Sequence, residues 1–228
     1  MAVAAKRAPV ACSGRFERAA RARGYLHAAG VDEVGRGALF GPVYAGAVIL
    51  HPDRPVRGLR DSKELTPEVR EVLAERIRER ALAYAIGAAD VYEIDRINIL
   101  QATRLAMRRA VVALQPAADY LLIDALKIEV PLPQEPLIGG DACCQAIAAA
   151  SILAKTARDA CMREWDRVFP EYGLARNKGY GTDEHYDALR RLGPTSLHRY
   201  SFWPVRESSQ LELWSGYDNQ PAEAHATA

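Results

Sequence analysis

Four acidic residues stand where they could do chemistry together. Asp32 and Glu33 are adjacent in the stretch GVDEVGRG, Asp124 closes the apolar run YLLID, and Asp141 follows a Gly-Gly pair. Carboxylates that converge repel one another, and in isolation at least one would take up a proton near neutral pH. Divalent cations remove that objection, because four carboxylates balance the charge of two Mg²⁺ ions, which prefer oxygen ligands. Such a metal pair activates water against a phosphate, so the implied reaction is phosphodiester hydrolysis.

Each acid also has an ordinary structural interpretation. An acid at a strand end or a helix start, such as Asp124 or Asp141, is usually a cap or a solvated group. Asp32 and Glu33 are harder to explain in this way, because ionised side chains are rarely left in an apolar strand without a partner. Spacing alone does not decide between a metal site and separate structural acids.

Glycines and basic residues accompany the acids and suit a ligand that carries phosphate. The glycines of Gly35-Arg36-Gly37 allow close backbone approach, and the guanidinium between them offers donors for phosphate. Basic and aromatic residues of this kind, which fit a nucleic-acid backbone, also stand at Lys63, Lys178, Tyr180, His198 and Arg199. The alternatives are a plain hairpin turn for the glycines, and packing or hydrogen-bonding roles for the aromatic and imidazole rings.

The elements that must position these residues follow from local patterns. Strands are predicted at 27–35 and 42–50, joined by the glycine-rich turn into an antiparallel pair, and a third at 82–91. The continuous apolar run 118–126 predicts a buried strand with Asp124 at its carboxyl edge, where ligands gather in open α/β sheets. Strands first, and then strands alternating with helices, indicate a mixed sheet flanked by helices.

Helices are predicted on both sides of the last strand. Thr66 as N-cap and Pro67 at the first position start one helix, whose apolar stripe is Val69, Val72, Leu73 and Ile77. Further helices are predicted at 98–114 and 146–165, while the proline-rich stretch 129–141 is expected to be a loop.

Composition bounds the class of protein. The 228 residues, 49% hydrophobic and 26% charged, are ordinary for one globular domain, and a net charge of +1 excludes a histone-like binder of nucleic acid. No apolar stretch is long enough to span a bilayer and the first residues do not form a signal peptide, so a soluble, cytoplasmic protein is expected. The cysteines lack the paired spacing of a zinc site and are interpreted as reduced: Cys12, Cys143, Cys144 and Cys161.

Seven separated blocks together resemble the type 2 ribonucleases H, the ribonuclease HII family. They are GVDEVGRGALFGPV, DSKELT, INILQAT, LLID, GDACCQAIAAASILAKTARD, NKGYGT and GPTSLHRYSFWPV. The resemblance covers about residues 15–206 and implies an α/β fold, a ribonuclease H-like mixed five-stranded sheet flanked by helices, with a C-terminal helical region. Residues 1–14 are expected to be disordered and 207–228 to form a flexible tail. The ribonuclease HIII type is disfavoured, because it lacks this Gly-Arg-Gly signature.

The same resemblance implies a function for the site. The four acids would bind Mg²⁺ or Mn²⁺, and a monomeric enzyme would cut the RNA strand of RNA–DNA hybrids. It would also cut duplex DNA at the 5′ side of single embedded ribonucleotides, leaving 3′-hydroxyl and 5′-phosphate ends. The backbone of Gly35-Arg36-Gly37 would read the 2′-hydroxyl, which separates RNA from DNA. Tyr180 would stack on the next sugar.

The chain departs from the family pattern at a few positions. Gly139 stands where Lys is usual, residues 142–145 replace small polar residues, and Asn177 stands where His is common. We expect altered local electrostatics or substrate preference from these changes, not lost catalysis. Asp159 is interpreted as a structural acid that pairs with a base on the long helix.

Two rival functions remain open at this point. One is a related nuclease or strand transferase that acts on DNA, which would cut an all-DNA duplex. The other is a hybrid-binding module with a decayed site, against which the presence of all four acids speaks.

The stretch SSQLELWSG resembles the short peptides with which bacterial repair proteins dock on the sliding clamp. An extended tail would place two leucines and an aromatic ring in an apolar groove, with glutamine fixing the register. The residues concerned are Gln210, Leu211, Leu213 and Trp214. The favoured alternative is that they pack the tail onto the domain, because such short motifs arise often by chance.

Overall fold

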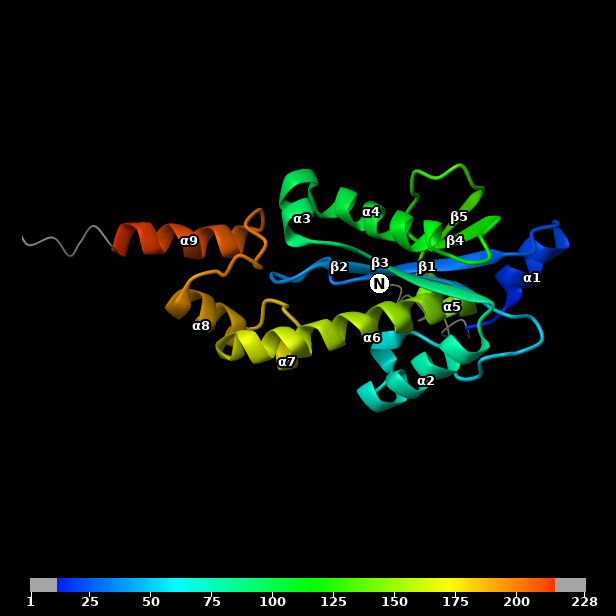
Figure 1. The fold of residues 1–228 in the computed structure, drawn as a ribbon, viewed down its shortest axis with the longest axis horizontal. Coiled ribbons are helices and arrows are strands. Elements are labelled where there is room, and N and C mark those ends of the chain that lie inside the picture. Colours follow the sequence, from blue (N-terminus) through cyan, green and yellow to red (C-terminus); the bar gives the residue numbers. More distant parts are fainter. Residues whose placement is uncertain (1–11, 216–228) are drawn as a thin grey trace, which may run out of the picture.

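A five-stranded mixed sheet forms the centre of the molecule (Figure 1). The structure, a computed structural model, describes residues 12–215, and side chains up to residue 209. The sheet order is β3-β2-β1-β4-β5, in which β1, β2 and β3 pair antiparallel while β4 and β5 run parallel to β1. This confirms the predicted fold class and the predicted antiparallel pair. The strands are β1 Ala28–Val34, β2 Val43–Ile49, β3 Ala83–Ala89, β4 Tyr120–Asp124 and β5 Gln134–Leu137.

Helices cover both faces of the sheet (Figure 1). α3 (Val91–Ile97) and α4 (Ile99–Val112) lie on one face, where the main apolar core forms. α6 (Gln145–Val168) lies on the other face, and α2 (Pro67–Arg80) packs against it. The helix α6 approaches β1 closely because Gly30 has no side chain: a Cβ there would lie 2.0 Å from the carbonyl carbon of Ala146.

Shorter elements extend both ends of this layered body (Figure 1). α1 lies at one end, and a C-terminal helical region that includes α8 and α9 lies at the other, as the resemblance implied. The elements not yet named, at these ends or between the longer ones, are α1 Arg15–Ala22, η1 Ser62–Glu64, α5 Gly140–Cys143, η2 Pro170–Tyr172, α7 Leu174–Asn177, α8 Asp183–Leu192 and α9 Trp203–Ser215.

The start of α2 is as predicted, but its buried face is not. The Thr66 hydroxyl accepts a hydrogen bond from the amide of Val69, and Pro67 opens the helix. Val69 and Val72 are 43% and 51% exposed, so half of the predicted apolar stripe is wrong. The helix is rotated so that Arg70 is buried instead, because this guanidinium bonds a carboxylate of α6.

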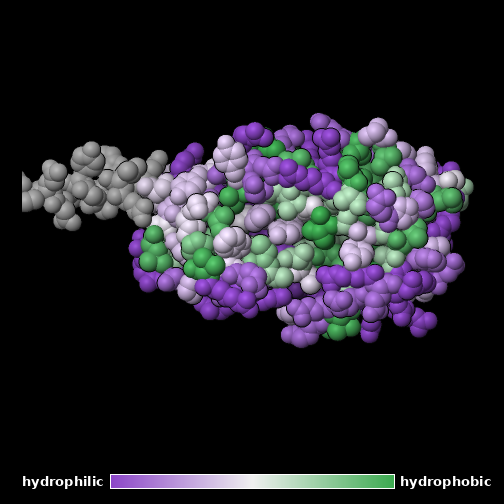
Figure 2. Space-filling model, viewed as in Figure 1, coloured by the Kyte–Doolittle hydropathy of each residue, from purple (hydrophilic) through white to green (hydrophobic). Residues whose placement is uncertain are grey.

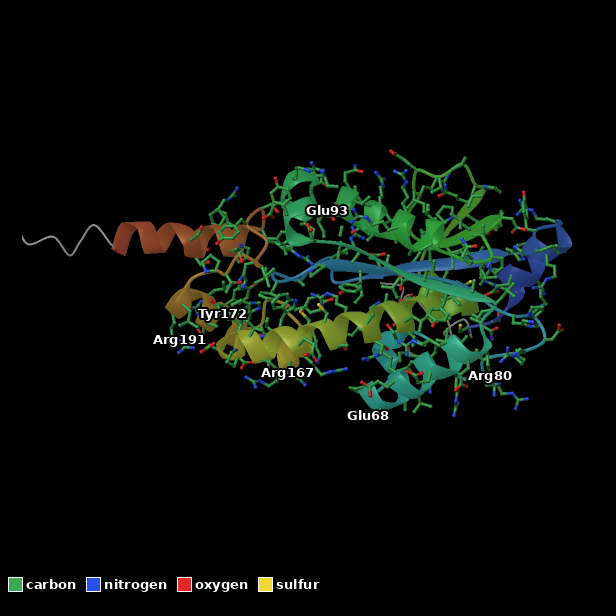
Figure 3. All side chains as sticks on the ribbon, in the orientation of Figure 1. Glu68, Arg80, Glu93, Arg167, Tyr172 and Arg191 are labelled. Carbon is green, nitrogen blue, oxygen red and sulfur yellow. The ribbon has the colours of Figure 1, made fainter. Side chains whose placement is uncertain are left out.

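β5 and α3 were not predicted from the sequence. The expected proline-rich loop contains β5, whose Pro136 is tolerated because this strand lies at the sheet edge. α3 follows β3 directly and begins at a capping box, in which Asp90 accepts from the Glu93 amide and Glu93 accepts in return from the Asp90 amide. Glu93, labelled in Figure 3, also pairs with Arg109 of α4 at 2.7 Å.

The structure differs from the predicted limits of the two terminal segments, residues 1–14 and 207–228. The amide of Ser13 donates to the Cys143 carbonyl, so the ordered chain begins before residue 15. At the other end, residues 207–215 continue α9, so this part of the predicted tail is helical. The clamp-like stretch 210–214 lies in that helix, so its backbone is not extended. The structure does not describe the side chains of these residues.

The surface carries polar and apolar residues in small groups. In the view of Figure 2 the apolar residues do not merge into one continuous patch. Among the helices within residues 12–215, none is long and apolar enough to cross a membrane.

Candidate active site

Two neighbouring parallel strands bring two of the acids to the same level. The register pairs Val31 of β1 with Ile123 of β4, so Asp32 and Asp124 are the next residues along each strand. Asp124 is the last residue of β4, and Asp32 is only 5% exposed. The carboxyl ends of adjacent parallel strands are where ligands bind in open α/β sheets.

The acid pair on β1 is coupled to the loop that follows it. Asp32 Oδ1 accepts from the amide of Glu33 at 2.8 Å, and Glu33 Oε1 accepts from Arg36 Nη1 at 3.2 Å. Glu33 Oε2 is buried and has no hydrogen-bond partner among the described residues. A buried carboxylate oxygen without a partner is costly unless a cation or a proton reaches it.

The second pair of acids is joined through the short helix α5. Asp124 Oδ1 accepts from the amide of Gly140 at 2.7 Å, which places the start of α5 against the end of β4. Asp141, the next residue, accepts from Lys63 Nζ at 3.1 Å through Oδ2. Lys63 lies on η1, and its side chain is 80% exposed, so the cation reaches the acids from the solvent side.

Burial, followed by the charges of neighbouring acids, raises the pKa of three of these carboxyl groups, so the three lie in one electrostatic environment. Burial raises the pKa of Asp32 well above its usual range, and the carboxylates of Glu33 and Asp124 raise it further. Burial also raises the pKa of Glu33, although Arg36 opposes this shift. The pKa of Asp124 is raised by burial and by Asp141, against the hydrogen bond from Gly140.

The donor set suits a hard divalent cation, but its arrangement is not a ready coordination shell. Within residues 12–215, no group of three or more His, Cys, Asp or Glu side chains is gathered closely enough to hold a metal ion. Each acid is turned toward a protein donor instead. Oxygen ligands, mutual repulsion and the unpaired oxygen of Glu33 fit Mg²⁺ or Mn²⁺. The four-acid metal site therefore stays a prediction.

The Gly-Arg-Gly loop, residues 35–42 between β1 and β2, is exposed at its tip and is hydrogen-bonded to a buried arginine on its inner side. Gly35 is buried with φ +91°, whereas Arg36 and Gly37 are exposed. Arg199 holds the loop, because Nη1 donates to the Arg36 carbonyl and Nε to the Gly41 carbonyl, both at 2.9 Å. The loop therefore presents Arg36 and Gly37 to solvent while Arg199 binds its backbone from the interior.

Direct substrate contacts by His198 and Arg199, which the sequence predicted, are contradicted by their burial. Both side chains are 0% exposed. His198 Nε2 lies 3.0 Å from His185 Nε2, and the Thr195 amide donates to His198 Nδ1 at 2.9 Å. The two residues hold the Gly-Arg-Gly loop against the C-terminal region, since Phe40 pairs with His198 in an isolated bridge.

Arg158 of α6 is a site residue that sequence reasoning missed. It is fully buried, and its guanidinium donates to the carbonyls of Phe40, Pro42 and Lys178 at 3.2, 3.3 and 2.8 Å. It thus joins the Gly-Arg-Gly loop to the NKGYGT loop. The signal available in the sequence was an arginine next to Asp159 at the end of a family block.

The NKGYGT loop lies beside the Gly-Arg-Gly loop, as a shared substrate surface requires. Ala38 and Tyr180 form an isolated antiparallel bridge, which brings the half-buried Tyr180 next to Gly37. Lys178 is half-buried, and its Nζ donates to the Ala175 carbonyl at 2.5 Å. Asn177, where the family often has His, is buried and donates to the Tyr172 carbonyl.

Two further predictions from the sequence are confirmed. Asp159 is a structural acid, because it pairs with Lys155 at 2.6 Å one turn earlier on α6 and with Arg70 at 3.3 Å. All four cysteines are free thiols.

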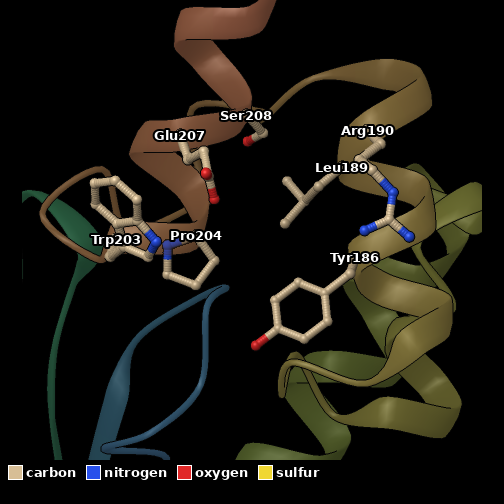
Figure 4. Close-up of a pocket in the computed structure, with 7 residues that line it drawn as sticks. All are labelled: Tyr186, Leu189, Arg190, Trp203, Pro204, Glu207 and Ser208. Atoms are coloured by element: carbon tan, nitrogen blue, oxygen red, sulfur yellow. The ribbon is translucent and has the colours of Figure 1, made fainter.

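A cavity of about 410 Å³ between α8 and α9 is separate from the acids (Figure 4). None of the predicted substrate or metal residues lines it. Its walls are formed by Tyr186, Leu189, Arg190, Trp203, Pro204, Glu207 and Ser208.

Comparison with solved structures identifies the class of fold. The ribonuclease H2 of Pyrococcus horikoshii OT3 superimposes with a TM-score of 0.68 at 22% identity, covering 82% of this chain and 98% of that one. The ribonuclease HII of Archaeoglobus fulgidus, solved in complex with PCNA, gives 0.65 at 20% identity over 86% and 98%. A Bst ribonuclease HIII in complex with Mn²⁺ gives 0.65 at 22% identity over 82% and 70%. The fold is therefore that of the type 2 ribonucleases H.

Sequence comparison narrows the class to one family. The model of the Ribonuclease HII family matches residues 29–205. The ribonuclease HII of Solibacter usitatus is 64% identical over 202 residues, which are 89% of each chain. That of Geobacillus kaustophilus is 54% identical over 193 residues, 85% of this chain and 74% of the relative. The chain belongs to the ribonuclease HII family and is a ribonuclease H, an endonuclease that hydrolyses RNA in RNA–DNA hybrids.

Proposed function

We propose that this enzyme cleaves the phosphodiester 5′ to a ribonucleotide, both in hybrids and at single ribonucleotides within duplex DNA. The products carry 3′-hydroxyl and 5′-phosphate ends, and catalysis uses two divalent ions at Asp32, Glu33, Asp124 and Asp141. The observation that best supports this is the β1–β4 register, which sets Asp32 level with Asp124, beside a glutamate whose buried oxygen has no hydrogen-bond partner in the described part of the chain.

The acids and their basic partners have distinct tasks. Mg²⁺ or Mn²⁺, when bound, would activate a water and stabilise the leaving oxygen. Arg36 and Lys63 neutralise Glu33 and Asp141 in the protein alone. Their side chains are 44% and 80% exposed, so both can turn away from the acids toward substrate phosphates as the metal charge arrives.

Selection for RNA falls to the Gly-Arg-Gly loop. A Cβ built on Gly37 would meet nothing within 4 Å, so a sugar can approach the backbone there. Backbone groups of the loop would then bond the 2′-hydroxyl, which DNA lacks. Tyr180, held next to this loop, would stack on the following sugar. We place this monomeric enzyme in the cytoplasm, where it would remove misincorporated ribonucleotides or RNA primers.

The direct test uses a labelled DNA duplex that contains one ribonucleotide. We expect a single cut 5′ to the ribonucleotide with Mg²⁺ or Mn²⁺, and none with EDTA. An all-DNA duplex of the same sequence, and the Asp124→Asn variant, are the controls. Equal cutting of both duplexes would favour a DNA nuclease, and binding of hybrid without any cut would favour a binding module.

A sliding clamp is proposed as a second partner, supported by the archaeal ribonuclease HII that was solved with PCNA. Stretch 210–214 would be the contact, although its backbone is helical here and a clamp groove takes an extended peptide. Packing of these residues on the domain stays the favoured alternative. Isothermal titration calorimetry of a peptide of residues 207–218 with the cognate clamp distinguishes the two possibilities. If no heat of binding is measured, docking through this motif is ruled out.

A further inference from the structure

The segment before β1 fastens the turn that carries Asp141, although it lies outside the matched residues 29–205. The amide of Ser13 donates to the Cys143 carbonyl at 3.1 Å, and Ser13 forms a parallel bridge with Cys144. α1 follows directly and packs at the end of the molecule where α5 and the start of α6 lie (Figure 1). Two successive pieces of the chain therefore hold the same short stretch.

Glu17 of α1 caps the long helix α6. Its Oε1 accepts from the amide of Ala146 at 2.6 Å and from the Cys144 thiol at 3.4 Å. The cap residue of α6 itself, Cys144, supplies no side-chain hydrogen bond, so the acid replaces the missing local cap. A negative charge at the N-terminus of a helix is favoured by the helix dipole, and α6 has 24 residues.

The capped stretch contains one proposed metal ligand, Asp141, and binds a second, Asp124, through a hydrogen bond. α5 spans Gly140–Cys143, and the Cys144 amide closes it by donating to the Gly140 carbonyl at 2.8 Å. The Gly140 amide in turn holds Asp124 Oδ1 at 2.7 Å. A shift at the start of α6 is therefore passed to Asp141 within one turn, and to Asp124 through a single hydrogen bond.

We propose that Glu17 is a positioning residue for the metal site. By capping α6 it fixes the stretch Gly140–Ala146, and so the position of Asp141 relative to Asp124 from which both side chains would turn to a divalent cation. The inference rests on the proposed metal role of these two acids. Without Glu17 the Ala146 amide loses its acceptor, the first turn of α6 loosens, and the acids lose their fixed separation.

The test measures metal binding and needs no turnover. Mn²⁺ is titrated calorimetrically into the full-length wild type, Glu17→Ala and Glu17→Gln, without substrate. We expect Glu17→Ala to bind Mn²⁺ about tenfold more weakly, at the lower end of the effects of removing groups that orient metal ligands. Glu17→Gln keeps a carbonyl oxygen for the Ala146 amide, so it should bind Mn²⁺ nearly as the wild type does. Hydrogen exchange at residues 142–146 should rise in Glu17→Ala only.

A matched control separates positioning from general stability. Asp90→Ala removes a carboxylate cap from α3, where Asp90 accepts from the Glu93 amide at 2.8 Å, and should leave Mn²⁺ binding unchanged. If Glu17→Ala does not fold, Glu17→Asp replaces it, because its carboxylate is one methylene too short and should also weaken Mn²⁺ binding.

Different failures have different meanings. Wild-type Mn²⁺ affinity in Glu17→Ala, or equal weakening in Glu17→Ala and Asp90→Ala, would overturn the positioning role. Equal weakening in Glu17→Gln and Glu17→Ala would overturn the hydrogen-bonded cap as its cause. A wild-type enzyme that binds no Mn²⁺ would instead refute the proposed metal site itself.

Discussion

Replacing Gly35 by alanine should damage the fold, whereas the same change two residues later should damage only function. Gly35 has φ +91°, a conformation that L side chains rarely adopt. A Cβ built there would lie 2.2 Å from Arg158 Nε and 2.7 Å from its Cδ. The substitution must therefore displace a buried guanidinium that holds three carbonyl groups.

The expected cost of Gly35→Ala follows from two contributions. A left-handed backbone costs alanine about 1–2 kcal/mol. Moving Arg158 breaks at least one hydrogen bond from a charged donor, worth about 1.5–3 kcal/mol. Together they predict a loss of about 2.5–5 kcal/mol in the free energy of unfolding.

Gly37→Ala is the matched contrast. Its φ is not left-handed, and its Cβ would meet nothing within 4 Å, so the free energy of unfolding should stay within about 0.5 kcal/mol of the wild type. The added methyl group would occupy the surface that a ribose approaches. Overpacking there should cost about 1–3 kcal/mol, or about fivefold to 160-fold in the rate of cleavage.

Urea denaturation followed by circular dichroism measures the first quantity, and cleavage of a duplex with a single ribonucleotide measures the second. An unfolding midpoint of Gly35→Ala equal to the wild type would refute the steric argument. Unchanged cleavage by a folded Gly37→Ala would show that substrate does not approach the loop at this residue.

Further substitutions and titrations test the charged groups. Asp124→Asn should lower metal-dependent cleavage more than about a hundredfold, because a ligand matters more than the groups that orient it. Its melting temperature in EDTA should not fall, since burial and Asp141 already raise the Asp124 pKa; a marked drop would contradict this. Burial and His185 lower the pKa of His198 from 6.5 to about 3, so the unfolded state binds more protons between these values. Stability should therefore fall as the pH is lowered from 6.5 to about 3, by up to about 1.4 kcal/mol per pH unit from this group, and an NMR titration in which the ring protonates near pH 6 would refute it. Asp159→Ala should lower the free energy of unfolding by about 3 kcal/mol in urea, because it leaves buried cations unpaired, and an unchanged midpoint would argue against that pairing.

Local signals predicted the elements whose causes are local. The Thr66 cap with Pro67 fixed the start of α2, and the glycine-rich turn predicted the pairing of β1 with β2. β5 has no such signal, because four residues that include a proline become a strand only by pairing with β4. The buried face of α2 could not be predicted either, because Arg70 is buried through its hydrogen bond with Asp159, which lies 89 residues away in the sequence.

The acids of the site could be found from residue type and order, but the roles of its arginines could not. An arginine that meets phosphate and one that holds backbone carbonyls look alike in a sequence, because both offer the same fork of donors. Arg36 is exposed beside Glu33, while Arg158 and Arg199 are buried beneath two loops. Only the tertiary structure shows which carbonyl groups each guanidinium can reach.

The burial of Arg199 nevertheless bears on how the loop could read RNA. Arg199 Nη1 binds the Arg36 carbonyl at 2.9 Å and so turns that oxygen toward the interior. In a planar trans peptide the carbonyl and the following amide point in opposite directions. The amide of Gly37 belongs to the same peptide unit, so it is directed away from Arg199, on the exposed side of the loop. Arg199, which the sequence predicted to contact the substrate, therefore acts indirectly. It orients the Gly37 amide toward the position proposed for the 2′-hydroxyl.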